Sequence, residues 1–490
     1  MRPIVQEISS PLGPDALVER LRGEPGVVLL RSSLFDSPQA RYSFVGARPF
    51  LTFRSFGSRC ELSGGGRVTE QFGDPWHLLD GLMARYELLE ELDLPFPLGG
   101  CFGYWGYDLK NFVEPKLSRR AVNDLELPDC HVGFHASVVV FDHRLEKVWI
   151  VATGLDFDGS REVARAEEQV RWWRDVLGRD SGACAQSPTQ CEKVGSNAGS
   201  DSMTSSFSRP DFIDAVERAQ RYIWAGDIYQ VNLAQRLSVP APCSGWDFFR
   251  RLNAVSPAPF SGYLDCGDLQ LASSSPELFL RLSGSHIQTR PIKGTRPRST
   301  DPMRDAQLTY ELQTSAKEMS ELVMITDLLR NDLGRVCEYG SVQVPELVRL
   351  ERYPQVQHLV STVEGRLRPD VTHFAALARC FPGGSITGAP KIRAVDIIDE
   401  LEPVTRGPYT GCLGYLGFNR ESQLNIVIRT AVFRGERAYF HVGAGIVADS
   451  SPEAEYEETM AKAAGFVAAL ERDIRMDANS VGIMSRRQGD

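Results

Sequence analysis

The sequence predicts an α+β protein that contains antiparallel sheets. Apolar runs such as GVVLLRSS, RYSFVGA and HASVVVFDH, at residues 26–33, 41–47 and 135–143, are interrupted by Gly, Pro and Asp, a pattern typical of strands in antiparallel sheets. Strands and helices alternate later without the regular βαβ repeat of a doubly wound fold. Further strands are expected at residues 269–275, 277–283, 424–433 and 438–447, and helices at residues 161–177, 210–225, 309–330, 372–380, 391–400 and 453–470.

One segment divides the chain unequally. Residues 180–206, DSGACAQSPTQCEKVGSNAGSDSMTSS, are rich in Ser, Gly and Ala and lack apolar periodicity, which is typical of a linker or a long exposed loop. A chain of 490 residues also suits two domains, because single cores seldom grow beyond roughly 250 to 300 residues. We expect a first domain at residues 1–180, a linker at residues 181–206, a second domain at residues 207–472 and a C-terminal tail at residues 473–490.

The composition argues against several classes of protein. With 42% hydrophobic residues, 24% charged residues and a formal net charge of −10, the chain resembles mildly acidic globular proteins. Nucleic acid binding needs a concentrated basic face, so we expect no nucleic acid partner. No apolar run reaches the roughly 18 to 20 residues of a membrane span, and the first twenty residues lack the apolar stretch of a signal peptide. We therefore expect a cytoplasmic protein without a membrane partner, in which the ten scattered cysteines are reduced.

Two expected helices each carry carboxylates on one face. Glu318 and Glu321 are three residues apart in the first, and Glu455, Glu458 and Lys462 share a face of the second. Such spacing is common on solvated helix faces. It also suits a site for Mg²⁺, a hard cation that binds carboxylate oxygens. Spacing alone does not decide between the two interpretations.

A series of motifs between residue 207 and about residue 470 resembles one family. The motifs are IWAGDIYQVNLAQR, SPE, PIKGTRPR, KEMSELVMITDLLRNDLG, QHLVSTVEG, FPGGSITGAPK, YTGCLGYLG, IVIRT and GAGIVADSSPEAEYEET. In this order they resemble the chorismate-utilising family of anthranilate, aminodeoxychorismate, isochorismate and salicylate synthases. The runs LLRSSLFDSPQARYSFVG and GGCFGYWGYD are similar to the N-terminal part of the same enzymes. The resemblance implies a large two-layered sandwich of antiparallel sheets with helices outside, and an active site in a cleft of the C-terminal portion.

The resemblance also implies roles for individual residues. Glu321 and Glu458 match direct Mg²⁺ ligands, and Glu318 and Glu455 match residues that reach the metal directly or through water. Glu277 matches a general acid, which needs a raised pKa. His358 matches an active-site histidine, although a lone histidine in a strand is more often a packed core residue. Residues expected at the substrate are Gly294, Thr295, Thr387, Gly443, Ala444, Gly445 and Lys462, with Tyr409 and Arg429 as the clamp for the enolpyruvyl carboxylate.

Two positions indicate which reaction the chain performs. Members of the family that add water have a lysine base where this chain has Gln230, and a glutamine cannot accept a proton at neutral pH. The resemblance therefore implies that ammonia is the nucleophile. The lysine of PIKGT, Lys293, matches the proposed covalent nucleophile of the aminodeoxychorismate synthases. We expect amination of chorismate at carbon 4, and the alternatives are formation of anthranilate and pyruvate, or a non-catalytic chorismate-binding homologue.

The source of ammonia is expected to lie outside this chain. Glutamine hydrolysis needs an activated cysteine with a histidine and a carboxylate. The run GGCFG fits a glutaminase elbow around Cys101, but no H-x-E pair follows it, and the run matches the N-terminal pattern of the synthases instead. We therefore expect a separate glutamine amidotransferase subunit as a partner.

A second ligand pocket is implied near the N-terminus. Residues that resemble the tryptophan pocket of the relatives are Ser32, Arg41, Tyr42, Pro259, Phe260 and Ser261. Where anthranilate synthases read L-L-E-S, this chain has Arg31, which argues against tryptophan inhibition and favours a structural or vestigial pocket.

Overall fold

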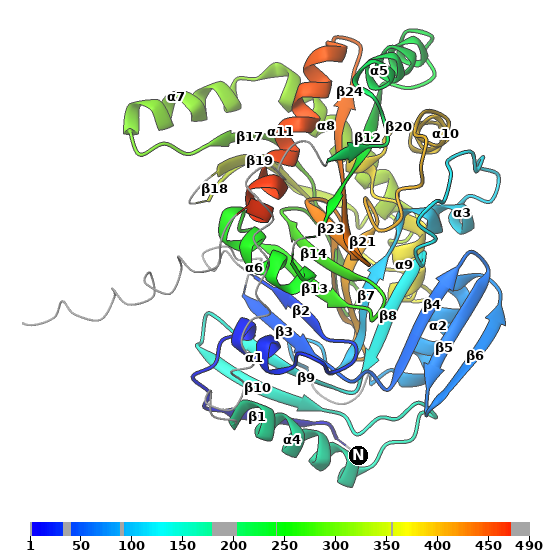
Figure 1. Ribbon diagram of the computed structural model, residues 1–490, viewed down its shortest axis with the longest axis vertical. Coiled ribbons are helices and arrows are strands. Elements are labelled where there is room, and N and C mark those ends of the chain that lie inside the picture. Colours follow the sequence, from blue (N-terminus) through cyan, green and yellow to red (C-terminus); the bar gives the residue numbers. More distant parts are fainter. Residues whose placement is uncertain are drawn as a thin grey trace, which may run out of the picture.

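Two large antiparallel sheets make up most of the molecule in the computed structural model (Figure 1). The structure describes residues 2–32, 41–88, 93–178, 203–241, 243–353 and 356–471. Within these residues the first sheet has the strand order β1 (Ile4–Ile8), β10 (Lys147–Ala152), β9 (Ser137–Asp142), β3 (Tyr42–Gly46), β2 (Val28–Arg31), β13 (Phe260–Asp265), β14 (Gln270–Ser275), β23 (Thr430–Arg434), β24 (Arg437–Ile446), β12 (Gln230–Pro240) and β11 (Thr204–Ser205), and β20 (Gly388–Ala389) also pairs with β12.

The second sheet faces the first. Its strand order is β17 (Ile292–Pro297), β19 (Val356–Arg366), β16 (His286–Arg290), β15 (Leu278–Ser283), β22 (Glu421–Ile426), β21 (Cys412–Gly417), β7 (Gly100–Trp105), β8 (Cys130–His135), β4 (Leu51–Phe56), β5 (Arg59–Gly64) and β6 (Arg67–Phe72), and β18 (Gln343–Arg352) pairs with β19. Side chains from both sheets share one hydrophobic cluster, in which the rings of Phe44 and Tyr415 have centroids 5.0 Å apart. The expected sandwich of antiparallel sheets is therefore confirmed.

Helices pack on both sheets. The helices are α1 (Pro14–Arg20), α2 (Pro75–Tyr86), α3 (Lys110–Val113), α4 (Val163–Gly178), α5 (Arg209–Trp224), α6 (Gly245–Val255), α7 (Pro302–Gln313), α8 (Ala316–Gly334), α9 (His373–Cys380), α10 (Lys391–Leu401) and α11 (Pro452–Glu471), with two short 3₁₀ helices, η1 (Tyr107–Leu109) and η2 (Gly384–Ile386). Helices α4, α6 and α11 pack on the first sheet, and α8 packs on β17, β18 and β19 of the second. Helices α5 and α10 cover β12, so strands and helices from distant parts of the sequence surround β12 and β24 (Figure 1).

Both sheets contain strands from before and after the expected linker. In the first sheet β2 pairs with β13, and in the second β7 pairs with β21. Most of residues 181–206, and the whole expected tail at 473–490, lie outside the described residues. Within the linker range, Thr204 and Ser205 form β11 and pair with β12. The expected division of the sequence is therefore not a division between the sheets.

One expected helix is wrong in its extent. Residues 309–330 were expected to be a single helix, but α7 ends at Gln313 and α8 begins at Ala316. Ser315 caps α8, because its hydroxyl accepts the backbone N–H of Glu318 at 3.4 Å. Residues 315–318 therefore carry the Ser-x-x-Glu pattern of a capping box, which begins a new helix in the middle of the predicted one.

One expected strand is also wrong. Residues 424–433 were predicted as one strand, but β22 ends at Ile426 in the second sheet and β23 begins at Thr430 in the first. Arg429 lies between them with a φ angle of 50°, in the left-handed region that non-glycine residues rarely adopt. The chain crosses here from one sheet to the other and leaves the Arg429 side chain exposed at the crossing.

The remaining predicted elements are confirmed, and four α-helices were not predicted. The expected helices other than 309–330 correspond to α4, α5, α9, α10 and α11, and the expected strands other than 424–433 correspond to β2, β3, β9, β14, β15 and β24. Helices α1, α2, α3 and α6 were not predicted. Asp74 caps α2 and Ser244 caps α6 through hydrogen bonds to backbone N–H groups of the first turn.

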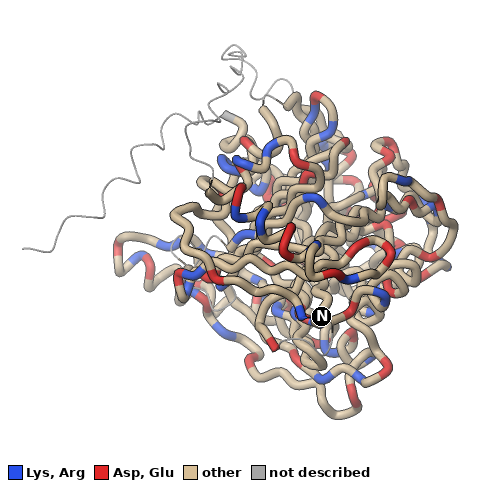
Figure 2. The backbone as a smooth tube through the Cα atoms, turned by 90° about the horizontal axis from the view of Figure 1, so that it is seen from below, with Lys and Arg blue, Asp and Glu red and all other residues tan. Residues whose placement is uncertain are grey.

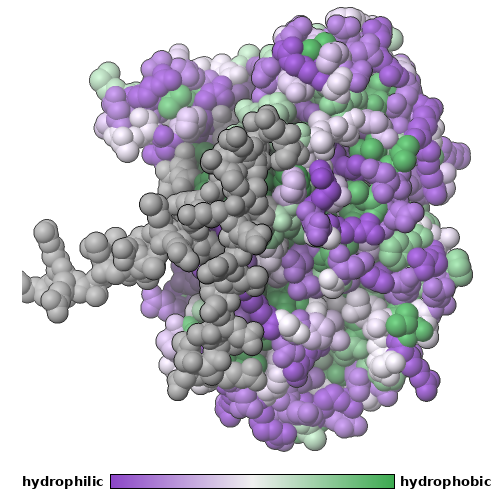
Figure 3. Space-filling model, viewed as in Figure 1, coloured by the Kyte–Doolittle hydropathy of each residue, from purple (hydrophilic) through white to green (hydrophobic). Residues whose placement is uncertain are grey.

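No helix in the described part of the chain combines the length and apolar character that crossing a membrane requires. Basic and acidic residues are interspersed along the backbone in the view from below (Figure 2). The space-filling view shows hydrophobic residues as separate patches among hydrophilic ones (Figure 3).

Candidate functional site

The floor of the candidate site is the pair of long strands β12 and β24. A Cβ atom at Gly443 would lie 2.8 Å from Asn232 Oδ1 and 2.9 Å from Tyr409 Oη. A Cβ atom at Gly445 would lie 2.6 Å from Gln230 Nε2. Any larger residue at these two positions would displace the neighbouring polar groups, so glycine keeps the backbone of β24 open to close approach.

Ala444, between the two glycines, faces the opposite side of β24. Successive side chains of a strand point to opposite faces, and Ala444 is fully buried in the hydrophobic cluster beneath α5 and α10. The expected contact of Ala444 with substrate would therefore be made by its backbone. Lys462 of α11 donates from Nζ to the carbonyl oxygen of Gly443 at 2.7 Å and holds α11 against this part of the strand.

Glu321 of α8 lies between two expected active-site residues. Lys293 Nζ is 2.7 Å from Glu321 Oε1, and Gln230 Nε2 donates to the same oxygen at 2.6 Å. Burial opposes ionisation of this carboxyl, but the charge of Lys293 and the hydrogen bonds outweigh burial, so the pKa of Glu321 lies below its ordinary value. The structure thus brings the proposed nucleophile, a proposed metal ligand and Gln230 together.

Glu318 lies one turn before Glu321 and faces the same loop. Arg296 Nη1 pairs with Glu318 Oε1 at 2.9 Å, while Glu318 Oε2 has no hydrogen-bond partner among the described residues. Gly294 has a φ angle of 65°, and a Cβ atom there would lie 2.1 Å from Glu318 Oε2. The glycine of PIKGT is therefore required for the loop to pass this carboxylate.

The acids of α11 have different surroundings. Glu455 accepts a hydrogen bond from Ser450 Oγ at 2.7 Å, and burial raises the pKa of Glu455 with a further contribution from Glu458. Glu458 pairs with Lys462 at 2.8 Å and is half exposed. Lys317 of α8 lowers the pKa values of both Glu321 and Glu455, so the acidic faces of α8 and α11 lie within electrostatic reach of each other.

The four expected metal ligands fit Mg²⁺ by chemistry rather than by a preformed geometry. All are carboxylates, the donors that this hard cation prefers, and one oxygen of Glu318 is buried without a partner. In the described part of the chain, no three His, Cys, Asp or Glu side chains are already grouped as a metal centre. Lys293 and Arg296 instead neutralise the two acids of α8.

Glu277 sits where β14 gives way to β15 and is 7% exposed. Burial raises the pKa of Glu277 to about 6, while a hydrogen bond from Ser385 and the charge of Lys293 oppose the rise. A carboxyl with this pKa carries a proton for part of the time near neutral pH, as a general acid requires. Ser385 was not singled out from the sequence, although it lies within the FPGGSITGAPK motif.

His358 and Thr295 face each other across β19 and β17. Thr295 Oγ1 is 2.8 Å from His358 Nδ1, and the two residues are partners in the strand register. Burial, together with the charge of Arg429, lowers the pKa of His358 to about 4. The imidazole is therefore neutral at physiological pH and acts as a hydrogen-bonding group rather than as a cation.

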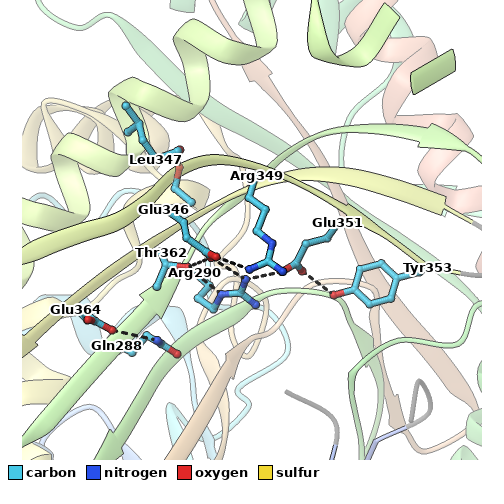
Figure 4. A network of polar contacts seen from close by, with 10 residues as sticks. Gln288, Arg290, Glu346, Leu347, Arg349, Glu351, Tyr353, Thr362 and Glu364 are labelled. Carbon is cyan, nitrogen blue, oxygen red and sulfur yellow. Dashed lines mark hydrogen bonds and ion pairs between the residues drawn. The ribbon is translucent and has the colours of Figure 1, made fainter. Parts of the chain in front are cut away.

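A network of polar contacts outside the predicted set supports the strand that carries His358 (Figure 4). Arg290 Nη2 pairs with Glu351 Oε1 at 2.5 Å, and Tyr353 Oη donates to Glu351 Oε2 at 2.9 Å. The Tyr353 ring lies 5.8 Å from the His358 ring. Buried Arg290 thus joins β16 to β18 through Glu351, and Tyr353 extends this network to the ring of His358.

The expected carboxylate clamp combines a buried tyrosine with an accessible arginine. Tyr409 stacks on His441 with ring centroids 4.9 Å apart, and burial raises the pKa of Tyr409 to about 12. Protein atoms around Arg429 lower its pKa by desolvation, and Arg429 forms no ion pair within the described residues. The hydroxyl of Thr387 donates to the carbonyl of Gly383 at 3.0 Å, so its proton is used within its own loop.

The expected tryptophan-like residues are brought together except for one. A small, partly open pocket is lined by residues that include Arg31, Ser32, Tyr42, Pro259, Phe260 and Ser261. Arg41 does not line the cavity, because its guanidinium pairs with Asp142 at 2.6 Å. Arg31 stands where anthranilate synthases have an acid. It pairs with Asp15 at 2.6 Å, so its charge is already neutralised by this ion pair.

The environment of Cys101 does not suit a glutaminase nucleophile. The residue is fully buried in β7, and burial raises the pKa of its thiol well above the ordinary value. A nucleophilic cysteine needs an accessible thiolate, so the prediction that GGCFG is structural is consistent with this position.

Comparison with known proteins identifies the family. A family model described as chorismate binding enzyme matches residues 31–468. Anthranilate synthase component 1 of Acetivibrio thermocellus is 38% identical over 476 residues, which cover 96% of this chain and 95% of that protein. Aminodeoxychorismate synthase component 1 of Escherichia coli strain K12 is 38% identical over 456 residues, which cover 92% and 95%.

A solved structure agrees with these relatives. The anthranilate synthase component I from Streptococcus pneumoniae TIGR4 has a TM-score of 0.73 and 30% sequence identity, and the match covers 88% of this chain and 93% of that one. The range matched by the family model contains most of both sheets and every residue assigned to the candidate site. The chain belongs to the family of chorismate binding enzymes.

Proposed function

We propose that the chain aminates chorismate with ammonia to give 4-amino-4-deoxychorismate. The observation that carries the proposal is the position of Lys293, which is mostly buried, contacts Glu321 at 2.7 Å and lies within electrostatic reach of Glu277. A primary amine and a carboxyl of raised pKa in one cleft supply a nucleophile and an acid for the same substitution. The covalent role of the lysine was expected from PIKGT, and the contacts of Lys293 support it.

The reaction divides into two displacements. In the first, Lys293 gives a proton to solvent, its amine lone pair forms a bond to ring carbon 2, the two ring double bonds shift, and the hydroxyl leaves carbon 4 as water with the proton of Glu277. In the second, ammonia forms a bond to carbon 4, the double bonds shift back, and the bond between carbon 2 and Lys293 breaks. Glu277 recovers its proton from the surplus on the new amino group. Chorismate and ammonia thus give aminodeoxychorismate and water.

The other residues hold the substrate. Arg429, which has no ion-pair partner in the described chain, and Tyr409 would bind the enolpyruvyl carboxylate. Neutral His358 would donate or accept a hydrogen bond at the ring, steadied by Thr295. Magnesium bound by Glu321, Glu458, Glu318 and Glu455 would neutralise the ring carboxylate and favour loss of the hydroxyl.

Ammonia is proposed to come from a glutamine amidotransferase partner. The relatives from Acetivibrio thermocellus and Escherichia coli are both called component 1, which implies a second component for each. Buried Cys101 gives this chain no glutaminase nucleophile at GGCFG.

A second candidate reaction is the conversion of chorismate to anthranilate and pyruvate. The anthranilate synthase component 1 from Acetivibrio thermocellus, which is 38% identical to this chain, favours it. The aminodeoxychorismate synthase component 1 from Escherichia coli, which favours the first reaction, is also 38% identical. The two products differ in mass and fluorescence. Purified chain should be incubated with chorismate, MgCl₂ and ammonium chloride. Aminodeoxychorismate is expected, and anthranilate would overturn the first proposal in favour of the second.

A further inference from the structure

Two residues of β12, on the floor of the site, carry amide oxygens without partners among the described residues. Gln230 Oε1 and Asn232 Oδ1 are both shielded from solvent and have no hydrogen-bond partner among the described residues. The two residues lie two positions apart on β12, so their side chains point to the same face, with α-carbons roughly 7 Å apart.

Neighbouring contacts fix where these amides lie. The Nε2 group of Gln230 donates a hydrogen bond to Glu321, so Oε1 of the same amide is the acceptor that has no partner among the described residues. The would-be Cβ positions place the amide of Gln230 over Gly445 and that of Asn232 over Gly443. Asn232 Oδ1 therefore lies against Gly443, and the Gln230 amide lies against Gly445, at the two glycines that open the strand to ligands.

The chemistry of these oxygens selects the ligand. A buried carbonyl oxygen without a partner destabilises the structure, and a hydrogen-bond donor removes that cost. Chorismate offers carboxylates, an ether and one hydroxyl, so it is rich in acceptors and poor in donors. Ammonia has three N–H bonds and one lone pair. It can donate to both oxygens and keep the lone pair free for attack.

We propose that Asn232, together with Gln230, binds and orients the ammonia nucleophile on the floor of the site. Amide oxygens suit this task because they accept hydrogen bonds without carrying a charge that would hold the nucleophile as ammonium. The inference rests on the proposed amination, and it assigns Asn232 a role that was not expected from the sequence.

The test is the saturation of the reaction with ammonium in the Asn232→Leu variant. Leucine has the same branched arrangement of side-chain heavy atoms as asparagine, although it is larger, and it has no acceptor. With purified chain, chorismate and MgCl₂ at fixed pH and ionic strength, half-saturation should need about five to ten times more ammonium chloride, as expected for one lost hydrogen bond. The KM for chorismate at saturating ammonium should change less than twofold. A raised chorismate KM with unchanged ammonium saturation would show that Asn232 binds the hydroxyl of chorismate, and would overturn the proposal.

Two further variants separate the role of Asn232 from a structural effect. Asn232→Ser keeps an uncharged acceptor oxygen on the same face of the strand and should restore part of the ammonium saturation, and a result no better than leucine would contradict the proposal. Ser238→Ala is the control variant. Ser238 lies on the same strand, but its hydroxyl accepts a hydrogen bond from Arg437, so the substitution should leave the ammonium half-saturation and the KM for chorismate unchanged. If the product is anthranilate, the assigned reaction falls but the ammonium constants still test Asn232. Absence of amination would overturn both.

Discussion

Helices α8 and α11 each carry a pair of glutamates of the candidate site, yet the two pairs have different partners. The acids of α8 are held by the PIKGT loop, where Lys293 contacts Glu321 and Arg296 contacts Glu318. On α11, Glu455 is held by a hydroxyl, and Glu458 pairs with Lys462 of its own helix.

This difference indicates separate functions for the acids of α8 and the acids of α11. The α8 pair is neutralised by basic side chains from another element, so ligand binding at these acids must compete with the loop that carries the nucleophile. The α11 pair is anchored within its own part of the fold, and burial raises the pKa of Glu455. We infer that α8 couples the metal to Lys293, whereas α11 completes the metal site.

The largest effect is expected from breaking the contact between Lys293 and Glu321. Lys293→Ala removes the proposed nucleophile and should slow amination on the order of a thousandfold or more, as loss of a covalent catalyst does. Chorismate binding, measured without ammonium, should remain within a few fold of the wild type. A variant that aminates at the wild-type rate would remove the covalent role.

The metal functions of the two helices can be compared directly with matched glutamine variants. Glu321→Gln should raise the Mg²⁺ concentration for half-maximal activity by about a hundredfold, because it removes a charged direct ligand. Glu455→Gln should raise it only about tenfold, because one oxygen of Glu455 already accepts a hydrogen bond from Ser450 and burial disfavours the charged form of this carboxyl. Mg²⁺ titration of the rate and calorimetry on the free chain would both report the difference. Equal effects at the two positions would contradict the division between the helices.

Glu277 is an acid of the candidate site that lies on neither α8 nor α11. Its pKa is raised from 4.5 to about 6 by burial, so the folded state binds its proton more tightly than the unfolded state. The resulting stability is fully present below about pH 4.5 and is lost as the pH rises through about 6, by about 2 kcal/mol. Glu277→Gln should be less sensitive to pH over this window in urea unfolding. An identical pH dependence in both proteins would show that Glu277 is not perturbed.

Much of this arrangement could be predicted from the sequence because it depends on local periodicity. Three-residue spacing placed Glu318 and Glu321 on one face of α8, and the resemblance supplied their partners on α11. The division between α7 and α8 was also readable, since Ser315 and Glu318 form a capping-box pattern, but the helical periodicity on both sides obscured it.

Other features had no local signal. Arg429 adopts a left-handed conformation that arginine does not favour, so the change of sheet after Ile426 depends on tertiary packing. The pairing of Arg296 with Glu318 and the open oxygens of Gln230 and Asn232 depend on how β17 and β12 approach α8. Residue types and spacing do not specify such contacts between distant segments.

The smallest effect is expected from Arg296, the second basic residue of the loop that carries Lys293. Arg296→Gln removes the charge that pairs with Glu318 but leaves Lys293 in place, so Glu318 becomes a freer ligand for Mg²⁺. Because a partly exposed ion pair is worth about 0.2 to 1 kcal/mol, the Mg²⁺ concentration for half-maximal activity should fall about twofold to fivefold. Arg298→Gln offers a matched control, since Arg298 pairs with Asp305 away from the four acids. If Arg296→Gln instead weakens Mg²⁺ binding, Arg296 orients Glu318 for the metal, and the competition inferred for α8 is wrong.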